Sequence, residues 1–352
     1  MVASPRPYRA PPWCPLSFPE LEPLGWGDRW VALLAAASHP DAVPGRVVRH
    51  DGSKVLVAFP KQRSIPMAPG IEPPVVGDWV GTVDDMVVDV LPRHSLLRRR
   101  DAIVDGEQAL AANVDVVFIV CGLDRPVRGG RLQRVAALAW DAGATPVVIL
   151  TKSDLGDHVE GAVADVRDDL HEVDVLVVSV VDGSGLEDVR AAARDRTVVL
   201  LGESGAGKST LVNALVDADV AATGAVREGD SKGRHTTTTR QLHPLPGGGV
   251  LLDSPGIRAV GLWVDPEAVD AVFPDIEALA EGCRFRDCAH GEEPGCAVIA
   301  AIGSEELPRE RYEAWRSLRR EAEAAAESAQ DRHRKNKQFG RISREAQRMK
   351  KR

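Results

Sequence analysis

Gly202-Glu203-Ser204-Gly205-Ala206-Gly207-Lys208-Ser209-Thr210 is the stretch from which the fold of this 352-residue chain can be read. It satisfies the pattern G-x-x-x-x-G-K-[ST], in which a glycine-rich loop joins a strand to a helix and wraps phosphate groups. An apolar run at 198–201 precedes it and a helical pattern at 208–216 follows it. The context predicts a phosphate-binding loop. A glycine turn that only caps a helix is the alternative.

Each part of this stretch has a physical role in a phosphate-binding loop. Backbone N–H groups at a positive helix terminus hold the phosphates, so every residue of 202–210 is a candidate nucleotide-binding position. The Lys208 ammonium would reach the β and γ oxygens, which also makes it a catalytic candidate, and the Ser209 hydroxyl would bind magnesium.

The patterns on both sides of the loop alternate between apolar strands and amphipathic helices. Such alternation predicts a parallel, doubly wound α/β sheet. The predicted strands are 114–120, 146–150, 173–178, 198–201 and 250–252, and the predicted helices are 131–142, 159–170, 186–193 and 208–216.

Thr151-Lys152-Ser153-Asp154 follows a predicted strand, at the edge where doubly wound sheets bind ligands. It is similar to the guanine-reading motif N-K-x-D of GTPases. The Asp154 carboxylate can accept hydrogen bonds from guanine N1–H and the exocyclic amine, a donor pair that adenine lacks. Thr151 stands where Asn is usual, so a hydroxyl would brace the pocket. The stretch Ser179-Val180-Val181-Asp182-Gly183-Ser184-Gly185-Leu186 resembles the loop that offers a backbone N–H to guanine O6. Together these loops predict GTP as the ligand.

Asp253-Ser254-Pro255-Gly256 resembles the D-x-x-G switch of GTPases. Asp253 would hold magnesium through water, and the backbone of Gly256 would sense the γ-phosphate. A second switch is expected at 224–240, where we predict that Thr237 reaches magnesium, with the neighbouring threonines as alternatives. A polar strand edge would also explain the threonine run.

The residue after the switch glycine is Ile257, where Ras-like enzymes have a water-orienting Gln. Intrinsic hydrolysis should therefore be slow. We hypothesise that His235 orients the attacking water; the alternative is that His235 contacts only solvent or RNA. The guanine loops precede the phosphate loop, whereas they follow it in most GTPases. The motif order is thus circularly permuted.

Cys283, Cys288, His290 and Cys296 have the spacing C-x4-C-x-H-x5-C. Three thiolates and an imidazole favour a closed tetrahedral site for one structural zinc ion. Free thiols beside an unrelated histidine are the alternative, and an iron–sulfur cluster is disfavoured because one candidate ligand is a histidine.

The remaining segments define the predicted domain organisation. Residues 1–40 form an irregular leader; 41–97 contain short strands that favour an OB-type barrel, although a β-sandwich fragment would look similar. Residues 98–262 form the GTPase domain, and 263–330 a zinc-binding helical domain. The segment 331–352 has ten Lys/Arg against two Asp/Glu within a chain of net charge −8. Such a basic tail can be a solvated disordered segment or a nucleic-acid contact.

With the motifs in view, the chain is similar to the ribosome small-subunit-dependent GTPase family (RsgA/YjeQ) over about residues 40–320. The resemblance rests on the permuted order and on Val76-Gly77-Asp78-Trp79-Val80, Gly233-Arg234-His235-Thr236-Thr237-Thr238, Asp253-Ser254-Pro255-Gly256-Ile257 and the Cys/His cluster. It implies a late assembly factor that binds the small ribosomal subunit and its rRNA, hydrolyses GTP to GDP faster on the subunit, and then leaves. It also suggests the role of His235.

Other properties limit the remaining possibilities. We expect no membrane span and no signal peptide, because no apolar stretch approaches eighteen residues. The cysteines do not resemble a secreted disulfide framework, so we expect a cytoplasmic protein. We also expect a monomer. Two rivals stay open: a permuted GTPase acting on the large subunit, and an RNA-binding module gated by nucleotide.

Overall fold

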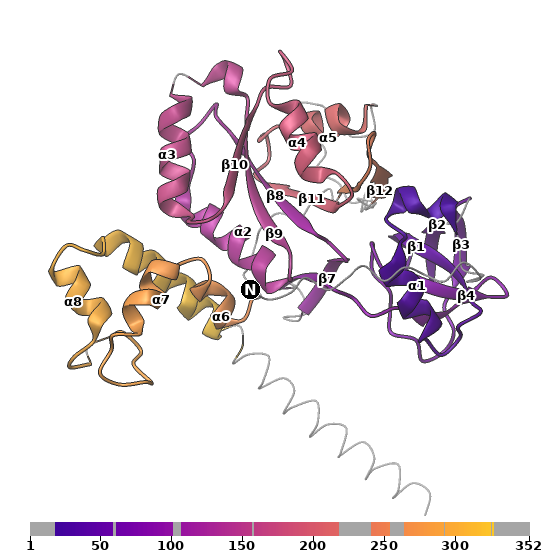
Figure 1. Ribbon diagram of the computed structural model, residues 1–352, viewed down its shortest axis with the longest axis horizontal. Helices are drawn as coiled ribbons and strands as arrows, with labels where there is room; N and C mark the ends of the chain where they lie inside the picture. Colours follow the sequence, from indigo (N-terminus) through magenta and orange to yellow (C-terminus); the bar gives the residue numbers. More distant parts are fainter. Residues whose placement is uncertain are drawn as a thin grey trace, which may run out of the picture.

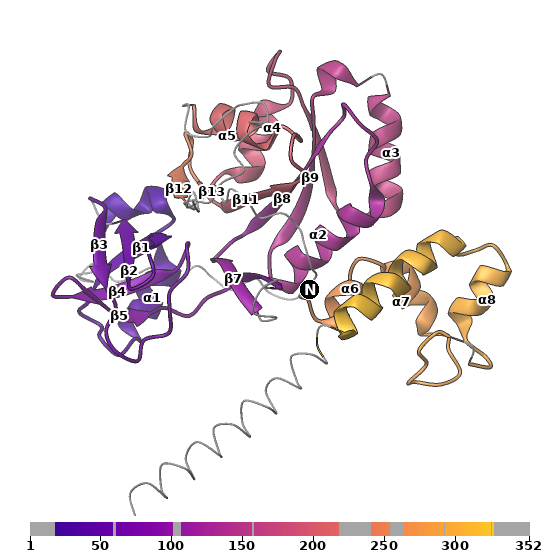
Figure 2. The ribbon, with the colours of Figure 1, turned by 180° about the vertical axis from the view of Figure 1, so that it is seen from behind.

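The computed structural model describes residues 18–58, 61–100, 107–156, 158–217, 241–253, 264–291, 293–324 and 326. These residues form a β-barrel, a central α/β sheet and a small helical unit (Figure 1). The barrel and the helical unit lie on opposite sides of the central sheet, as the view from behind also shows (Figure 2). The fold class predicted from the sequence is confirmed.

The barrel is a five-stranded antiparallel sheet with the order β3-β2-β1-β4-β5. A parallel bridge between Met67 and Val87 joins its two edges, which closes the sheet in the manner of an OB fold. Alternate residues along the strands point inward, and Val47, Val57 and Val80 are fully buried. The strands are β1 (Val43–His50), β2 (Lys54–Ala58), β3 (Arg63–Pro66), β4 (Trp79–Val83) and β5 (Met86–Val90).

A short hairpin joins the barrel to the central sheet. β6 (Leu96–Arg100) pairs antiparallel with β7 (Glu107–Ala112). Neither strand was predicted, because three consecutive arginines at 98–100 do not show an apolar strand pattern. Arg98 donates a hydrogen bond to the buried carboxylate of Asp141, at 2.9 Å, which explains a charged residue within a strand.

The central sheet has six strands in the order β10-β9-β8-β11-β13-β12. Five are parallel, as predicted, but β12 pairs antiparallel with β13. A tight turn through three glycines connects β12 to β13, and such a connection allows only an antiparallel pair. The strands are β8 (Val116–Gly122), β9 (Thr145–Thr151), β10 (Asp174–Val178), β11 (Thr197–Gly202), β12 (Gln241–Pro244) and β13 (Val250–Asp253).

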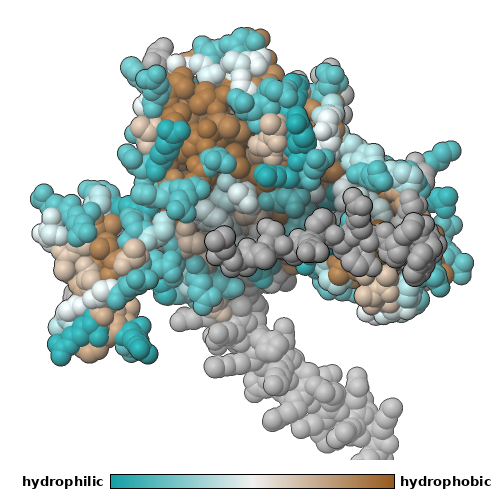
Figure 3. Space-filling view, viewed as in Figure 1, coloured by the Kyte–Doolittle hydropathy of each residue, from teal (hydrophilic) through white to brown (hydrophobic). Residues whose placement is uncertain are grey.

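Helices cover both faces of this sheet because β8 is apolar on both sides. Val117 and Ile119 pack with α2 (Gly129–Asp141) and α3 (Val159–Asp169), whereas Phe118 packs with α4 (Leu186–Ala193) and α5 (Lys208–Val216). This two-sided burial is typical of a parallel sheet. An apolar area also reaches the surface between α3 and α4, over the edge strand β10 (Figure 3).

The helical unit packs against α2 through α6 (Pro266–Asp270). It also contains α7 (Pro274–Ala280), α8 (Ala297–Gly303) and a helix over 309–324. Trp315 donates from its indole nitrogen to Asp270 at 2.9 Å, and Arg134 of α2 pairs with Glu321 at 2.7 Å. Among the described residues, no helix combines the length and apolar character needed to cross a membrane.

A buried arginine joins the barrel to the first residue of β11. Arg46 is 1% exposed and donates hydrogen bonds to the Thr197 hydroxyl at 2.8 Å, to Gly77 O at 3.3 Å and to Leu24 O. Burial lowers the pKa of Arg46 to about 10, so its guanidinium still carries a charge at neutral pH. Thr197 N donates to Asp115 at 2.6 Å. The polar junction therefore fixes the barrel to the base of β11.

Three tryptophans pack beside this junction. Trp26 follows the helix η1 (Pro19–Leu24), Trp30 lies in α1 (Asp28–Ala35), and Trp79 begins β4. The ring of Trp79 lies 4.9 Å from that of Trp26 and 5.8 Å from that of Trp30, between ring centroids. All three are buried. This aromatic cluster gives the N-terminal helices and the barrel a common core.

Candidate functional site

The predicted phosphate and guanine loops meet at one edge of the central sheet. They follow the carboxyl ends of β10, β9 and β11, and β8 lies between β9 and β11 in the sheet. A parallel sheet places such ends side by side, and the point where the strand order reverses is where ligands bind. Residues far apart in the sequence, such as Asp124 and Lys208, are thus collected at one place.

The phosphate loop has the backbone that its glycines predict. Gly205 and Gly207 have φ angles of +80° and +84°, which L side chains rarely adopt. At Gly202 an added Cβ would lie 2.2 Å from Val120 O, so only glycine fits beside β8. Gly207 caps α5, whose first turn contains Ser209 and Thr210. The loop therefore presents its N–H groups at a helix N-terminus.

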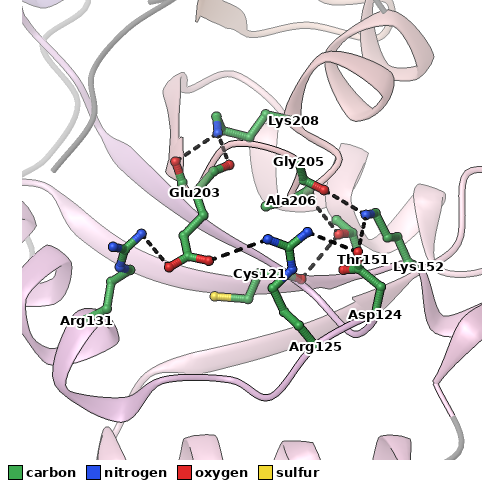
Figure 4. A network of polar contacts seen from close by, with 11 residues as sticks. Cys121, Asp124, Arg125, Arg131, Thr151, Lys152, Glu203, Gly205, Ala206 and Lys208 are labelled. Carbon is green, nitrogen blue, oxygen red and sulfur yellow. Dashed lines mark hydrogen bonds and ion pairs between the residues drawn. The ribbon is translucent and has the colours of Figure 1, made fainter. Parts of the chain in front are cut away.

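Lys208 lies along the inside of this loop. Its ammonium donates hydrogen bonds to Gly202 O, at 2.8 Å, and to Glu203 O (Figure 4). These two carbonyls belong to the start of the loop, whereas Lys208 follows its end, so the ammonium lies within the curve of the loop backbone. A positive charge held there can attract a polyphosphate.

The Thr151 hydroxyl links the guanine loop to the phosphate loop. Its oxygen lies 2.6 Å from Ala206 O and 3.2 Å from Cys121 O. A hydroxyl has only one hydrogen to donate, so the shorter contact to Ala206 is the stronger bond. Thr151 is buried, and this bond replaces the brace that an asparagine amide would supply.

Lys152 reaches over the phosphate loop from the same strand end. Its ammonium bonds to Gly205 O at 2.7 Å and to the Asp124 carboxylate at 2.8 Å. Hydrogen bonds from Arg125 and Lys152 lower the pKa of Asp124 to about 2. The Asp124 side chain is 27% exposed, so solvent screens the pair and its main effect is to orient Lys152.

Ser179 orients the carboxylate predicted to read guanine. Its hydroxyl donates to Asp154 Oδ1 at 2.7 Å and accepts from the backbone N–H of Val181 at 3.2 Å. At Gly185, with φ of +69°, a Cβ would lie 1.9 Å from Val177 O, so the loop closes only with glycine. Asp154 itself is exposed, and Ser153 is half-buried beside it.

Several predicted site residues lie outside the part of the chain that the structure describes, so they cannot be located relative to the nucleotide-binding edge of the sheet. Thr237, His235 and Gly256 lie outside the described residues, as do the segment 224–240 and the basic tail 331–352. Asp253 ends β13, next to β11, but its side chain is also outside the described part of the chain. Their roles stay predictions.

Charged residues from outside the predicted motifs surround Glu203, which is one of the predicted nucleotide-binding positions. Glu203, in the second loop position, pairs with Arg131 of α2 at 2.6 Å and lies 3.9 Å from Arg125 (Figure 4). Asp124, Arg125 and Arg131 belong to no motif. For Asp124 and Arg125 the available signal was their position in the loop after the predicted strand 114–120, which neighbours the phosphate-loop strand. Arg131 belongs to the predicted helix that follows this loop.

A cavity of about 400 Å³ lies between the phosphate loop and the start of α2. Val127, Val135 and Cys121 line it, and Arg125 and Arg131 also face it. Burial, together with the smaller effect of the Glu203 charge, raises the pKa of the Cys121 thiol to about 11. The thiol is therefore protonated at neutral pH and is a poor nucleophile.

The four predicted zinc ligands form a cluster in the helical unit. The candidate ligand atoms of Cys283, Cys288, His290 and Cys296 all lie within 4.8 Å of one another. His290 Nδ1 is 3.5 Å from both Cys283 Sγ and Cys296 Sγ. Burial lowers the pKa of His290, which favours the neutral imidazole that a metal requires. Three sulfur donors and one nitrogen fit tetrahedral zinc.

Backbone and side-chain contacts hold this cluster in place. Ala297 N donates to Cys283 Sγ at 3.3 Å, and the Tyr312 hydroxyl donates to His290 O at 2.6 Å. The Trp315 ring packs 5.6 Å from that of His290, between centroids. Such contacts orient ligands before a metal binds.

Comparisons with known proteins agree with this architecture. The family model for the RsgA GTPase matches residues 90–263. The small ribosomal subunit biogenesis GTPase RsgA of Streptomyces avermitilis is 45% identical over 315 residues, which cover 86% of this chain and 85% of that protein. The protein of the same name from Xanthomonas euvesicatoria is 41% identical, with 89% and 91% covered.

Solved structures support the fold. The crystal structure of YjeQ from Thermotoga maritima is similar with a TM-score of 0.58 and 24% identity, over 79% of this chain and 98% of that chain. YloQ, a circularly permuted GTPase, gives a TM-score of 0.57 and 23% identity over 82% and 98%.

Proposed function

The chain belongs to the RsgA GTPase family, and on that premise we propose that it hydrolyses GTP during late maturation of the small ribosomal subunit. GTP binds at the edge formed by residues 202–210, 151–154 and Ser179. The subunit and its rRNA stimulate hydrolysis, and the GDP form leaves. We place the protein in the cytoplasm as a monomer, with the domain boundaries predicted above.

One observation supports this proposal most strongly: the hydroxyl of Thr151 bonds to Ala206 O at 2.6 Å. It ties the loop that would select the base to the loop that would hold the phosphates. Ser179 in turn orients Asp154, at 2.7 Å. A guanine nucleotide would therefore meet a base-reading carboxylate and a phosphate cradle held at a fixed separation.

Magnesium fits this edge because hydroxyl and carboxylate oxygens are its preferred ligands. Ser209, Asp253 and Thr237 would hold it, directly or through water. When bound, the ion neutralises charge on the β- and γ-phosphates. Lys208 adds a second positive charge at the same oxygens, and Gly256 would contact the γ-phosphate through its backbone N–H.

We infer that His235 orients the attacking water when the protein is bound to rRNA. The chain has Ile257 where a water-orienting glutamine would stand, so another side chain must do this. The His235→Ala variant should lose subunit-stimulated turnover by about a hundredfold. GTP affinity should not change. Full stimulated turnover in this variant would exclude the role.

The Cys3His cluster would bind one structural zinc ion, with all four positions taken by the protein. The ion would hold the loop 283–296 against the helix 309–324. Together with the barrel, this unit gives the GTPase two arms on opposite sides of the nucleotide domain, both available to rRNA (Figure 1).

The decisive experiment measures GTP turnover with purified small subunits, with large subunits and with neither. We expect slow turnover alone, stimulation by small subunits and none by large ones. Stimulation by large subunits alone would indicate another permuted GTPase. The matched control is Asp154→Asn, which should lose the preference for guanine over adenine nucleotides because an amide cannot accept from both guanine donors.

A further inference from the structure

We propose that Arg125, on the loop after β8, is a further phosphate-binding side chain whose guanidinium contacts the phosphates of the bound nucleotide. The inference rests on the proposed placement of GTP at residues 202–210. It concerns a residue outside every motif described above, so it adds a contact that the phosphate loop itself does not supply.

The first reason is position. The guanidinium of Arg125 lies directly beside the phosphate loop, because a Cβ built on Gly205 would be only 3.2 Å from its Nη2. Figure 4 shows the group between Glu203 and Asp124, on the side of the loop where Lys152 also lies. A small rotation of a long side chain would bring it to a group held by this loop.

The second reason is that the partners of Arg125 do not depend on it. Arg125 Nη2 donates to Asp124 at 3.0 Å, and Nη1 lies 3.9 Å from Glu203. Asp124 keeps Lys152 at 2.8 Å, and Glu203 keeps Arg131 at 2.6 Å. If Arg125 turns away, neither carboxylate loses its only cation. The Arg125 side chain is 44% exposed, so water can hydrate the guanidinium while it changes position.

The other cations at this edge are more firmly engaged. Lys152 and Lys208 bond to backbone carbonyls of the phosphate loop, and Arg131 is the nearer partner of Glu203. A guanidinium is also well suited to phosphate, since its fixed N–H groups can bond to two oxygens at once. Of these four cations, Arg125 is thus the one that can change partner with least disruption.

A competing role for Arg125 is to neutralise Glu203. A carboxylate in the phosphate loop repels a polyphosphate, and Arg125 could simply offset that charge. The two roles differ in one respect. If Arg125 acts only through Glu203, removing the Glu203 charge makes Arg125 dispensable; if it contacts phosphate, it stays necessary.

The test measures dissociation constants of fluorescent GDP and of a fluorescent non-hydrolysable GTP analogue. Arg125→Ala should weaken binding of both by about tenfold, and Arg125→Lys should recover part of the loss. The loss should persist when Arg125→Ala is combined with Glu203→Gln. Wild-type affinity in Arg125→Ala, or a loss that disappears in the Glu203→Gln background, would overturn the inference.

Two further variants separate this inference from the proposed site. Arg128→Ala is the matched control, because Arg128 lines the same cavity three residues later; its affinity should stay within about twofold of the wild type. Lys208→Ala should lose most binding. If it does and Arg125→Ala does not, only the Arg125 contact fails. If Lys208→Ala binds normally, the nucleotide site is elsewhere and both proposals fail.

Discussion

The two ends of β11 hold polar networks of opposite kinds. At its first residue, Thr197, the network is buried, and Arg46 donates to three oxygens from separate segments of the chain. At its last residue, Gly202, the network surrounds the phosphate loop, and the side chains of Asp124 and Arg125 are 27% and 44% exposed. The same strand therefore ends in a structural network and in one that is open to a ligand.

The difference follows from the cost of burying charge. A buried guanidinium must have its hydrogen bonds filled, so Arg46 is committed to the barrel junction. Partly exposed charged side chains gain little free energy from an ion pair, so they lose little when they exchange one partner for another. The charges at the phosphate loop can therefore regroup around an incoming anion, while those at the base of β11 cannot.

The largest expected effect is at the buried end. Arg46→Met keeps the volume of the side chain but leaves Leu24 O, Gly77 O and the Thr197 hydroxyl without their donor. We expect the free energy of unfolding to fall by about 4 kcal/mol, measured by urea denaturation. Nucleotide affinity of the remaining folded protein should not change. A large loss of affinity would mean that the two networks are coupled through β11.

A smaller loss of stability is expected when only the Thr197 hydroxyl is removed from this buried network. Thr197→Val removes the hydroxyl that accepts from Arg46 at 2.8 Å while keeping the branched shape. We expect a loss of about 2 kcal/mol in unfolding free energy, because a buried charged donor is left unpaired. Thr197→Ser retains the hydroxyl and should lose less. Equal losses in the two variants would contradict the hydrogen-bond explanation.

Thr151 offers the matching change at the phosphate end. Thr151→Val removes the donor to Ala206 O and should weaken GTP binding about fivefold, or about 1 kcal/mol, in a fluorescence titration. Thr151→Ser should bind like the wild type. We expect unfolding free energy to change less than in Thr197→Val. The reverse order would show that the guanine loop is mainly structural.

The last prediction needs no substitution and concerns the reactivity of Cys121, which lines the cavity beside the phosphate loop. Ionisation creates a charge, so burial disfavours the thiolate and raises the pKa to about 11. At pH 8 its reaction with iodoacetamide should be about a hundredfold slower than that of an ordinary thiol. The rate, followed by mass spectrometry of the Cys121 peptide, should still rise at pH 10. A plateau near pH 9 would show that the Cys121 thiol has an ordinary pKa and is more accessible to solvent than the structure indicates.

The sequence predicted the residues whose chemistry is local. Glycines with positive φ, a lysine directly after the last of them and a strand before them specify a phosphate loop by short-range geometry alone. The Cys/His spacing likewise predicts the cluster that the structure brings together. Apolar patterns were sufficient for the five parallel strands of the central sheet and for the helices that cover it, but the short antiparallel strand β12 was not predicted.

Contacts between distant segments could not be predicted in this way. Arg46 and Thr197 are 151 residues apart, and no short pattern links them. The strand β6 was obscured by its three consecutive arginines, and the partner of Arg98, Asp141, lies 43 residues further along the chain. Arg125 was missed for the same reason. It lies beside Gly205 only because the strands that precede the two residues, β8 and β11, are neighbours in the folded sheet.

The aromatic cluster at the barrel junction also gives the molecule a built-in optical reporter. Of seven tryptophans in the chain, Trp26, Trp30 and Trp79 lie together, with ring centroids 4.9 and 5.8 Å from Trp79. Rings this close share excitation energy, so a single quenching event within the trio dims all of it. Because Trp79 lies in the barrel and Trp26 and Trp30 lie with the N-terminal helices, intrinsic emission can report a separation of these two parts without any attached dye.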